Sequence, residues 1–206
     1  GQPILWHIMK LYSHYGFNDF IICLGYKGYY IKEFFANYVL HRSDVAIGLA
    51  ESRVHFDNPH EIPPWTVRLV DTGADTMTGG RLKRVGHLLG DEPFCMTYGD
   101  GLSKVDIRAP VDFHTGDGLE ATVTAGIPAG RYRATVVEGE KVVRFEEKPA
   151  GDGGYINGGF FVLNPSVLDR IEGDTTPFEF DPLTSLAGDG QLGAFVHKGF
   201  WQGIDK

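Results

Sequence analysis

The chain has 206 residues, of which 42% are hydrophobic and 22% charged, a composition typical of a globular domain that can bury a full core. Its net charge of −8 disfavours a nucleic-acid-binding or anionic-membrane-binding surface, although phosphates can still bind where a metal or an arginine sets the local field. No apolar run reaches the ~20 residues needed to cross a bilayer, and no charged leader opens the chain. The two cysteines, Cys23 and Cys95, lie in apolar runs and predict buried thiols without a disulfide. We therefore expect a cytoplasmic protein with no nucleic-acid or membrane partner.

The first 40 residues predict a helix, a strand and a second helix. Apolar residues recur at helical spacing over 4–12, residues 19–24 predict a fully buried parallel strand, and a turn at 25–28 leads into the second helix. This order is typical of an α/β layer.

The rest of the chain alternates similarly and then becomes rich in strands. The expected strands and helices, in chain order, are short strands within 44–71, a helix after 81, a strand at 94–98, a helix at 105–114, strands at 121–125, 132–137, 141–146 and 155–163, helices at 165–171 and 183–187, and strand-like runs at 194–197 and 200–201. Glu138 and Gly139 separate two alternating runs, which predicts a hairpin.

Two aspartates follow strand-like runs. Asp100 comes after 94–98, and Asp205 comes after the runs near the end of the chain. Ligands collect at the carboxyl ends of strands in open α/β sheets, and two carboxylates there would suit Mg²⁺ and, through it, phosphates. The alternative is that each aspartate is an ordinary turn residue beside glycine.

The turn at 72–81 is rich in glycine and hydroxyl groups. Thr76 and Thr78, the Gly79–Gly80 pair and Arg81 together favour a phosphate or base cradle at a helix N-terminus. The alternative is a plain strand-to-helix loop in which Thr78 caps the helix. The turn matches neither the P-loop nor the dinucleotide-binding pattern, which weakens kinase and dehydrogenase hypotheses.

Two further segments carry polar groups at strand ends. Glu147 and Lys148 would accept from sugar hydroxyls and meet a phosphate, or else form a solvated charge cluster on a strand edge. Asn157 with Gly158 and Gly159 predicts either a ligand contact or a β-bulge. The histidines lack metal-ligand spacing and no nucleophile elbow is present, so a covalent mechanism has no candidate residue.

Several motifs, taken in order, resemble those of the glucose-1-phosphate cytidylyltransferases, a family of sugar-nucleotide pyrophosphorylases. The likeness runs along essentially the whole chain, and its segments are the opening 1–6 (with Gln2 where lysine is usual), 25–28, 70–73, 77–84, 98–101, 147–149, 156–161 and 200–202.

The resemblance implies transfer of CMP from CTP to glucose 1-phosphate, giving CDP-glucose and pyrophosphate for deoxysugar or polysaccharide biosynthesis. It implies Mg²⁺ as cofactor and a homo-oligomer as the assembly. The implied metal ligands are Asp100 and Asp205. The implied substrate contacts are Thr76 and Arg81 for the nucleotide, Gly99 through its backbone, Glu147, Asn157 and Gly158 for the sugar, and Lys148 for its phosphate.

Two departures from the family affect these expectations. The glycine-rich family signature, which supplies the central first strand and most triphosphate contacts, would lie upstream of residue 1. Arg133 stands where the family usually has glycine near the sugar, which leaves the choice of sugar open.

The predicted fold is a Rossmann-like, three-layer α/β nucleotidyltransferase fold (GT-A-like) with a mixed, mostly parallel sheet that lacks its first strand. We expect one domain over 1–206, with a nucleotide-binding part at 1–125 and a sugar-binding part at 126–206. The alternatives are a relative that uses another nucleotide or sugar phosphate, and a non-catalytic sugar-nucleotide-binding domain. Exposed aromatics such as Tyr29, Tyr30 and Phe56 would serve either a subunit interface or the core.

Overall fold

A computed structural model of the chain describes residues 1–57, 62–126, 134–138, 141–146 and 155–204. The predicted opening is confirmed as α1 (Ile4–His14), β1 (Asp19–Leu24) and α2 (Gly28–Ala36). The strand β1 is mostly half-buried and was wrongly expected to be fully buried, because among the described residues it pairs along one edge only.

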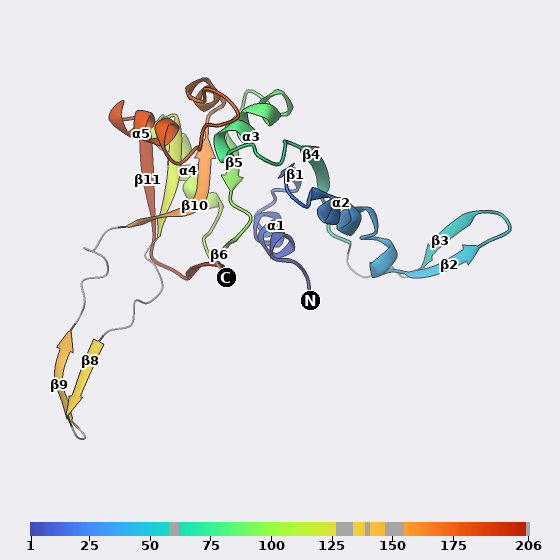
Figure 1. Cartoon of the computed structure of the whole chain (residues 1–206), viewed down its shortest axis with the longest axis horizontal. Coiled ribbons are helices and arrows are strands. Elements are labelled where there is room, and N and C mark those ends of the chain that lie inside the picture. Colours follow the sequence, from blue (N-terminus) through green and yellow to red (C-terminus); the bar gives the residue numbers. More distant parts are fainter. Residues whose placement is uncertain (58–61, 127–133, 139–140, 147–154, 205–206) are drawn as a thin grey trace.

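Two groups of strands form the centre of the molecule (Figure 1). In the first, β1 pairs in parallel with β4 (Thr66–Asp71). In the second, the order is β11-β7-β10-β5, with bounds β5 (Phe94–Thr97), β7 (Ala121–Gly126), β10 (Ile156–Leu163) and β11 (Leu192–His197). Since β10 is antiparallel to both neighbours and β11 is parallel to β7, three of these four strands run the same way. The expected mixed sheet is confirmed, although two of its three described ladders are antiparallel.

No hydrogen-bonded ladder joins β1 to β5 within the described ranges.

Helices cover both faces of the four-stranded sheet, which gives the expected three layers. The remaining helical elements of the described residues are η1 (Leu40–Arg42), α3 (Thr78–Val85), η2 (Gly86–Leu88), α4 (Arg108–Asp117), η4 (Pro165–Arg170) and α5 (Asp181–Gly188). Two expectations need correction: the helix expected at 105–114 begins only at Arg108, and the one expected at 165–171 is the 3₁₀ helix η4.

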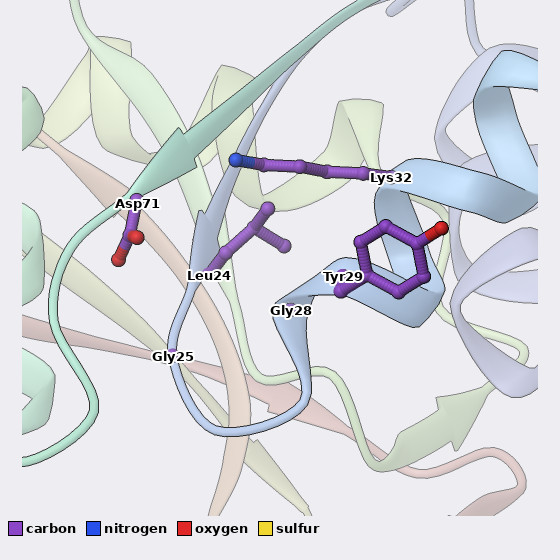
Figure 2. Close-up of a pocket in the computed structure, with 6 residues that line it drawn as sticks. All are labelled: Leu24, Gly25, Gly28, Tyr29, Lys32 and Asp71. Carbon is purple, nitrogen blue, oxygen red and sulfur yellow. The ribbon is translucent and has the colours of Figure 1, made fainter.

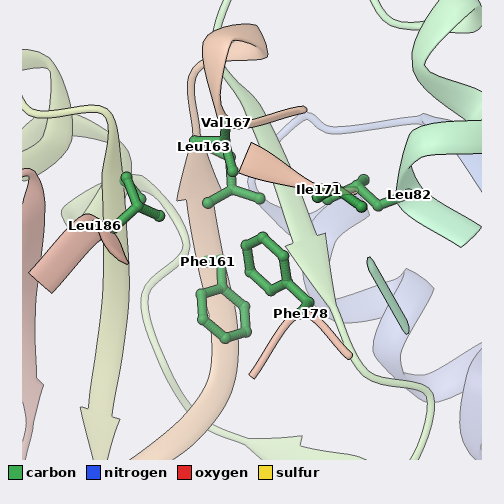
Figure 3. Close-up of a cluster of buried hydrophobic side chains, with 8 residues drawn as sticks. Leu82, Phe161, Leu163, Val167, Ile171, Phe178 and Leu186 are labelled. Carbon is green, nitrogen blue, oxygen red and sulfur yellow. The ribbon is translucent and has the colours of Figure 1, made fainter. Parts of the chain in front are cut away.

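Two hydrophobic clusters lie on opposite faces of β10. Phe161 packs edge-on against Phe178 at a ring separation of 5.6 Å, in a cluster completed by η4, α3 and α5 (Figure 3). The preceding residue, Phe160, stacks on Tyr12 of α1 in the other cluster. This opposition follows from the strand, because successive side chains of a strand point to opposite faces.

Two hairpins and one short ladder complete the described structure. The hairpins are β2 (Asp44–Gly48) with β3 (Arg53–Asp57), which projects from the body in Figure 1, and β8 (Ala134–Glu138) with β9 (Lys141–Glu146), which confirms the expected hairpin. The ladder, not expected as such from the sequence, pairs β6 (Gly101–Ser103) with β12 (Trp201–Gly203). Both cysteines are free, as predicted, but they are half-buried where buried thiols were expected. No described helix is both long and apolar enough to cross a bilayer.

Replacement of Phe161 by alanine tests the importance of the first cluster. Phe161 is only 2% exposed, so Phe161→Ala should lower the free energy of unfolding by about 3–5 kcal/mol, as measured by urea denaturation. The matched control is Leu49→Ala, since Leu49 is 87% exposed and should change stability by less than about 0.5 kcal/mol. Equal effects of the two substitutions would contradict this description of the core.

Candidate active site

A pocket of about 200 Å³ lies between the end of β5, the start of β10 and the β6–β12 ladder. Three residues that the sequence nominated, Asp100, Asn157 and Gly158, line it together. Its other lining residues are Thr97, Tyr98, Gly101, Gly159, Trp201 and Gly203.

Asp100 lies in the turn between β5 and β6 with its side chain exposed. Its main-chain carbonyl accepts a hydrogen bond from the N–H of Ile204 at 2.8 Å, directly after the pairing of Gly101 with Gly203. The antiparallel β6–β12 ladder therefore brings residues 100 and 204 next to each other. The sequence had instead predicted that the two aspartates meet at the carboxyl ends of strands in an open α/β sheet. Asp205 itself lies outside the described residues.

The donor chemistry of Asp100 suits a hard divalent cation, since an exposed carboxylate on the pocket rim offers oxygen ligands of the kind that Mg²⁺ prefers. In the described ranges, which exclude Asp205, no group of three or more His, Cys, Asp or Glu side chains could by itself enclose a metal.

Asn157 is held in a defined orientation at the start of β10. Its Oδ1 accepts a hydrogen bond from the N–H of Gly159 at 2.8 Å, and its Nδ2 lies 3.5 Å from the Tyr98 hydroxyl as donor. The register of β10 against β7 shifts between Asn157 and Phe161, and Gly159 has a φ of +74°. The segment is therefore a local irregularity in the strand, as the β-bulge alternative predicted, and it is also part of the pocket wall, whereas the ligand contact stays a prediction.

Gly158 contributes its backbone to the same wall. Its carbonyl accepts a hydrogen bond from the Trp201 indole N–H at 2.7 Å, and a Cβ at this position would lie 2.7 Å from the carbonyl oxygen of Thr124 on β7. Only glycine permits this approach without a shift of backbone. Trp201 was not among the nominated site residues; the signal available was an aromatic residue just before the second acid.

Tyr98 was also not nominated as a site residue. Its ring packs on Phe161 at 5.7 Å. Burial first, and then the carboxylate of Glu179, raise the pKa of Tyr98 well above its ordinary value.

The Arg81 guanidinium donates hydrogen bonds within its own chain, mostly to backbone carbonyl oxygens. Its Nη1 donates to the carbonyl of Leu24 at 3.0 Å and to the Thr72 hydroxyl at 2.8 Å, while Nη2 donates to the carbonyl of Ala74 at 3.3 Å. The guanidinium thus ties together the carboxyl ends of β1 and β4. Neither Arg81 nor the buried Thr76 lines the pocket that contains Asp100.

Gly79 and Gly80, just before Arg81, leave room for another segment of the protein to pack closely against α3. A Cβ on Gly79 would lie 2.6 Å from the carbonyl oxygen of Thr176, and one on Gly80 would lie 2.5 Å from the Cα of Asp174. The helix begins at Thr78, with Met77 at the N-cap position and no side-chain cap, so the expectation that Thr78 caps the helix is wrong. The close approach permitted by these glycines is used for packing against 174–178.

A second cavity, of about 180 Å³, lies at the carboxyl ends of β1 and β4 (Figure 2). Gly25, Gly28, Tyr29, Lys32 and Asp71 line it together with Leu24. It therefore adjoins the strand ends that Arg81 holds, and it includes part of the motif at 25–28. Glu147, Lys148 and Arg133 lie outside the described residues, and Gly99 is exposed in the turn beside Asp100.

Comparison with known proteins decides the family. The chain is 56% identical over all 206 residues to a glucose-1-phosphate cytidylyltransferase of Salmonella typhi and covers 80% of that protein. The chain belongs to the glucose-1-phosphate cytidylyltransferase family. It is therefore a nucleotidyltransferase, as the motifs predicted.

A second relative agrees with this assignment, and a solved structure agrees with the fold. The chain is 42% identical over its full length to a Bacillus subtilis protein named "probable glucose-1-phosphate cytidylyltransferase", of which it covers 80%. The crystal structure of HddC from Yersinia pseudotuberculosis complexed with GMP-PN matches 99% of this chain and 80% of its own, with a TM-score of 0.65 at 20% identity, which supports the fold. No protein-family model matches the chain.

The backbone contacts of Arg81 lead to a prediction about stability. Arg81→Lys keeps the charge but cannot make all three contacts, so it should lower the free energy of unfolding without nucleotide by about 1–3 kcal/mol in urea denaturation. The control is Arg53→Lys at an exposed position of β3, which should have little effect. An unchanged free energy of unfolding for Arg81→Lys would mean that the three contacts of Arg81 do not stabilise the fold and that its role is to bind a ligand.

Proposed function

We propose that the protein transfers CMP from CTP to glucose 1-phosphate, giving CDP-glucose and pyrophosphate, with Mg²⁺ as cofactor. The observation that carries this proposal is the meeting of Asp100 and Asn157 around one pocket in a chain 56% identical to a protein of that name. Binding of small molecules also agrees with the GMP-PN complex of the structural relative.

The reaction requires no covalent intermediate. An oxygen of the sugar phosphate attacks the α-phosphorus of CTP in line, the bond to the β-phosphate breaks, and pyrophosphate leaves. A phosphate needs no general base at neutral pH, so positioning and charge neutralisation account for the catalysis.

Each predicted site residue would have a role that its chemistry suits. Asp100 and Asp205 would hold Mg²⁺, which when bound neutralises charge on the phosphate oxygens. The amide of Asn157 has its orientation fixed by Gly159 and would hydrogen-bond the sugar hydroxyls. Lys148 would meet the sugar phosphate, and Glu147 the sugar. Thr76, Arg81 and Gly99 would serve the nucleotide; for Arg81 this is in addition to its backbone contacts.

The proposal extends to organisation and assembly. Residues 1–125 would bind the nucleotide and 126–206 the sugar, in a cytoplasmic homo-oligomer without nucleic-acid or membrane partners. Tyr29 and Tyr30 are more than 60% exposed and Phe56 is 42% exposed within this chain, which favours a subunit interface over core packing.

The choice of nucleotide is tested by pyrophosphate release. The full-length protein with Mg²⁺ and glucose 1-phosphate should release pyrophosphate with CTP and much less with UTP, dTTP, GTP or ATP, and EDTA should stop the release. Preference for another nucleotide, or release only with a different sugar phosphate, would favour a relative of altered specificity, which Arg133 motivates. No pyrophosphate release with any of the substrates would favour a non-catalytic sugar-nucleotide-binding domain.

The role of Asp100 is tested by removal of one negative charge. Asp100→Asn should lower kcat at least about 100-fold while the unfolding curve stays unchanged, because the amide is a much weaker ligand for Mg²⁺. Asp91→Asn in the exposed loop before β5 is the control and should retain full activity. Full turnover by Asp100→Asn would exclude Asp100 as a metal ligand.

A further inference from the structure

Trp201 lies in the strand that holds the turn containing Asp100. The strand β12 begins at Trp201 and pairs with β6 as far as Gly203. The N–H of the next residue, Ile204, then donates to the carbonyl of Asp100 at 2.8 Å. The main chain of Trp201 is therefore fixed relative to the turn that carries the predicted metal ligand.

The side chain of Trp201 reaches from this ladder to the start of β10. Its indole N–H donates to the carbonyl of Gly158 at 2.7 Å, and a Cβ on Gly126 of β7 would lie 3.6 Å from its Cγ, in ordinary contact. The ring also packs against the hydrophobic cluster that contains Phe160. The indole therefore joins the β6–β12 ladder to the β7–β10 pair, which belong to different sheets among the described residues.

The carbonyl of Gly158 needs a partner outside the β7–β10 ladder because β10 is irregular there. The ladder pairs Asn157 with Ala125 and resumes at Phe161 opposite Val123, so it includes no pair at Gly158. Gly158 is buried, and a buried carbonyl without a hydrogen bond is costly. The indole N–H of Trp201 satisfies this carbonyl.

The carbonyl of Gly158 and the N–H of Gly159 belong to one peptide unit, which is planar and rigid. The Trp201 indole holds the carbonyl end of this unit, and Oδ1 of Asn157 accepts from its N–H end at 2.8 Å. A rotation of the peptide plane would break both hydrogen bonds, so the indole and the Asn157 amide are coupled through it. Since an indole has a single donor, Trp201 has no further hydrogen bond to offer a substrate.

We propose that Trp201 is a positioning residue, which fixes the Gly158–Gly159 peptide unit relative to the Asp100 turn and thereby orients the Asn157 amide for the sugar phosphate. The inference rests on the proposed function, since it assigns Asn157 to the sugar side of the pocket. Trp201 lines the same pocket but donates its N–H to Gly158, so it acts through that peptide unit and is not a catalytic residue.

Steady-state kinetics of the full-length Trp201→Phe enzyme test the inference. Phenylalanine keeps an aromatic ring in the core but has no N–H, so the KM for glucose 1-phosphate should rise about tenfold, equivalent to about 1.4 kcal/mol. The KM for CTP should change less than about twofold, because the peptide unit lies on the sugar side. Adding Trp201→Phe to Asn157→Ala should raise the KM for glucose 1-phosphate no further, since both substitutions act through the same peptide unit.

The matched control is Trp6→Phe, which removes an indole hydrogen bond of similar length, 2.8 Å to the Tyr38 hydroxyl, away from the pocket lining. It should leave the KM values for both substrates unchanged. A readout independent of turnover is the side-chain amide resonance of Asn157 in ¹⁵N-labelled protein, which should shift in Trp201→Phe and stay in place in Trp6→Phe.

If Trp201→Phe does not fold, the coupling is measured in the opposite direction. The indole N–H of Trp201 should exchange with solvent more slowly in the wild-type protein than in Asn157→Ala, because that substitution releases the other end of the peptide unit. Equal exchange rates would overturn the inference.

Three kinetic results would also overturn it: an unchanged KM for glucose 1-phosphate in Trp201→Phe, an equal rise in the KM values for both substrates, or a further rise in the double variant. An inactive wild-type enzyme would instead refute the proposed function, and the amide resonance would still decide whether Trp201 orients Asn157.

Discussion

The placement of β10 between β5 and β7 is the constraint on which the rest of the structure depends. Because successive side chains of a strand alternate, Phe160 and Phe161 anchor the cores on the two faces of the sheet, and each is only 2% exposed. The same strand begins with Asn157 and the two glycines that form the pocket wall. Packing of the core therefore fixes the position of polar groups in the site, and the irregular register at the start of β10 is maintained by a well-packed strand behind it.

The fold also depends on glycines at which two backbone segments lie in close contact. Gly79 and Gly80 allow the segment around Asp174 to lie directly on α3, and Gly158 allows β10 to pass close to β7. A side chain at any of these positions would meet a carbonyl oxygen or an α-carbon at less than 3 Å, which requires the backbone to move. The glycines thus have a structural reason to be present that does not involve a ligand. Through the packed segment they also place the Glu179 carboxylate where it accepts a hydrogen bond from the Thr78 hydroxyl.

The charge of the described pocket lining indicates that phosphate binding there requires positive charge from elsewhere. Its lining residues include the carboxylate of Asp100 but no lysine or arginine, so its described wall alone would repel a phosphate. Binding of two anionic substrates there requires added positive charge, and a divalent cation on Asp100 and Asp205 with Lys148 nearby would supply it. Arg81 is an unsuitable sole source, since its guanidinium already donates to two carbonyl oxygens and a hydroxyl at the ends of β1 and β4.

Local pattern was sufficient for most of the secondary structure and for the family. Apolar periodicity and turn residues predicted the opening helix–strand–helix unit, the hairpin at Glu138 and most later strands, because these signals depend on neighbours along the chain. Periodicity did not distinguish the 3₁₀ helix η4 from an α-helix, nor did it reveal that the helix of 105–114 starts three residues late, because end geometry depends on packing. The motif at 98–101 and the amide at 157 were likewise sufficient to nominate Asp100 and Asn157 for one site.

The sequence by itself determined the class of fold and the family, and it nominated residues for binding a metal or a sugar, since these follow from residue types and their order. Only the tertiary structure decided which groups meet. It united Asp100, Asn157 and Gly158 in one pocket, brought Trp201 and Tyr98 into its wall, and directed Arg81 to the backbone of its own chain. The physical reason is that hydrogen bonds between residues far apart in the chain, such as Trp201 and Gly158 (43 positions) and Thr78 and Glu179 (101 positions), leave no periodic signal in the sequence.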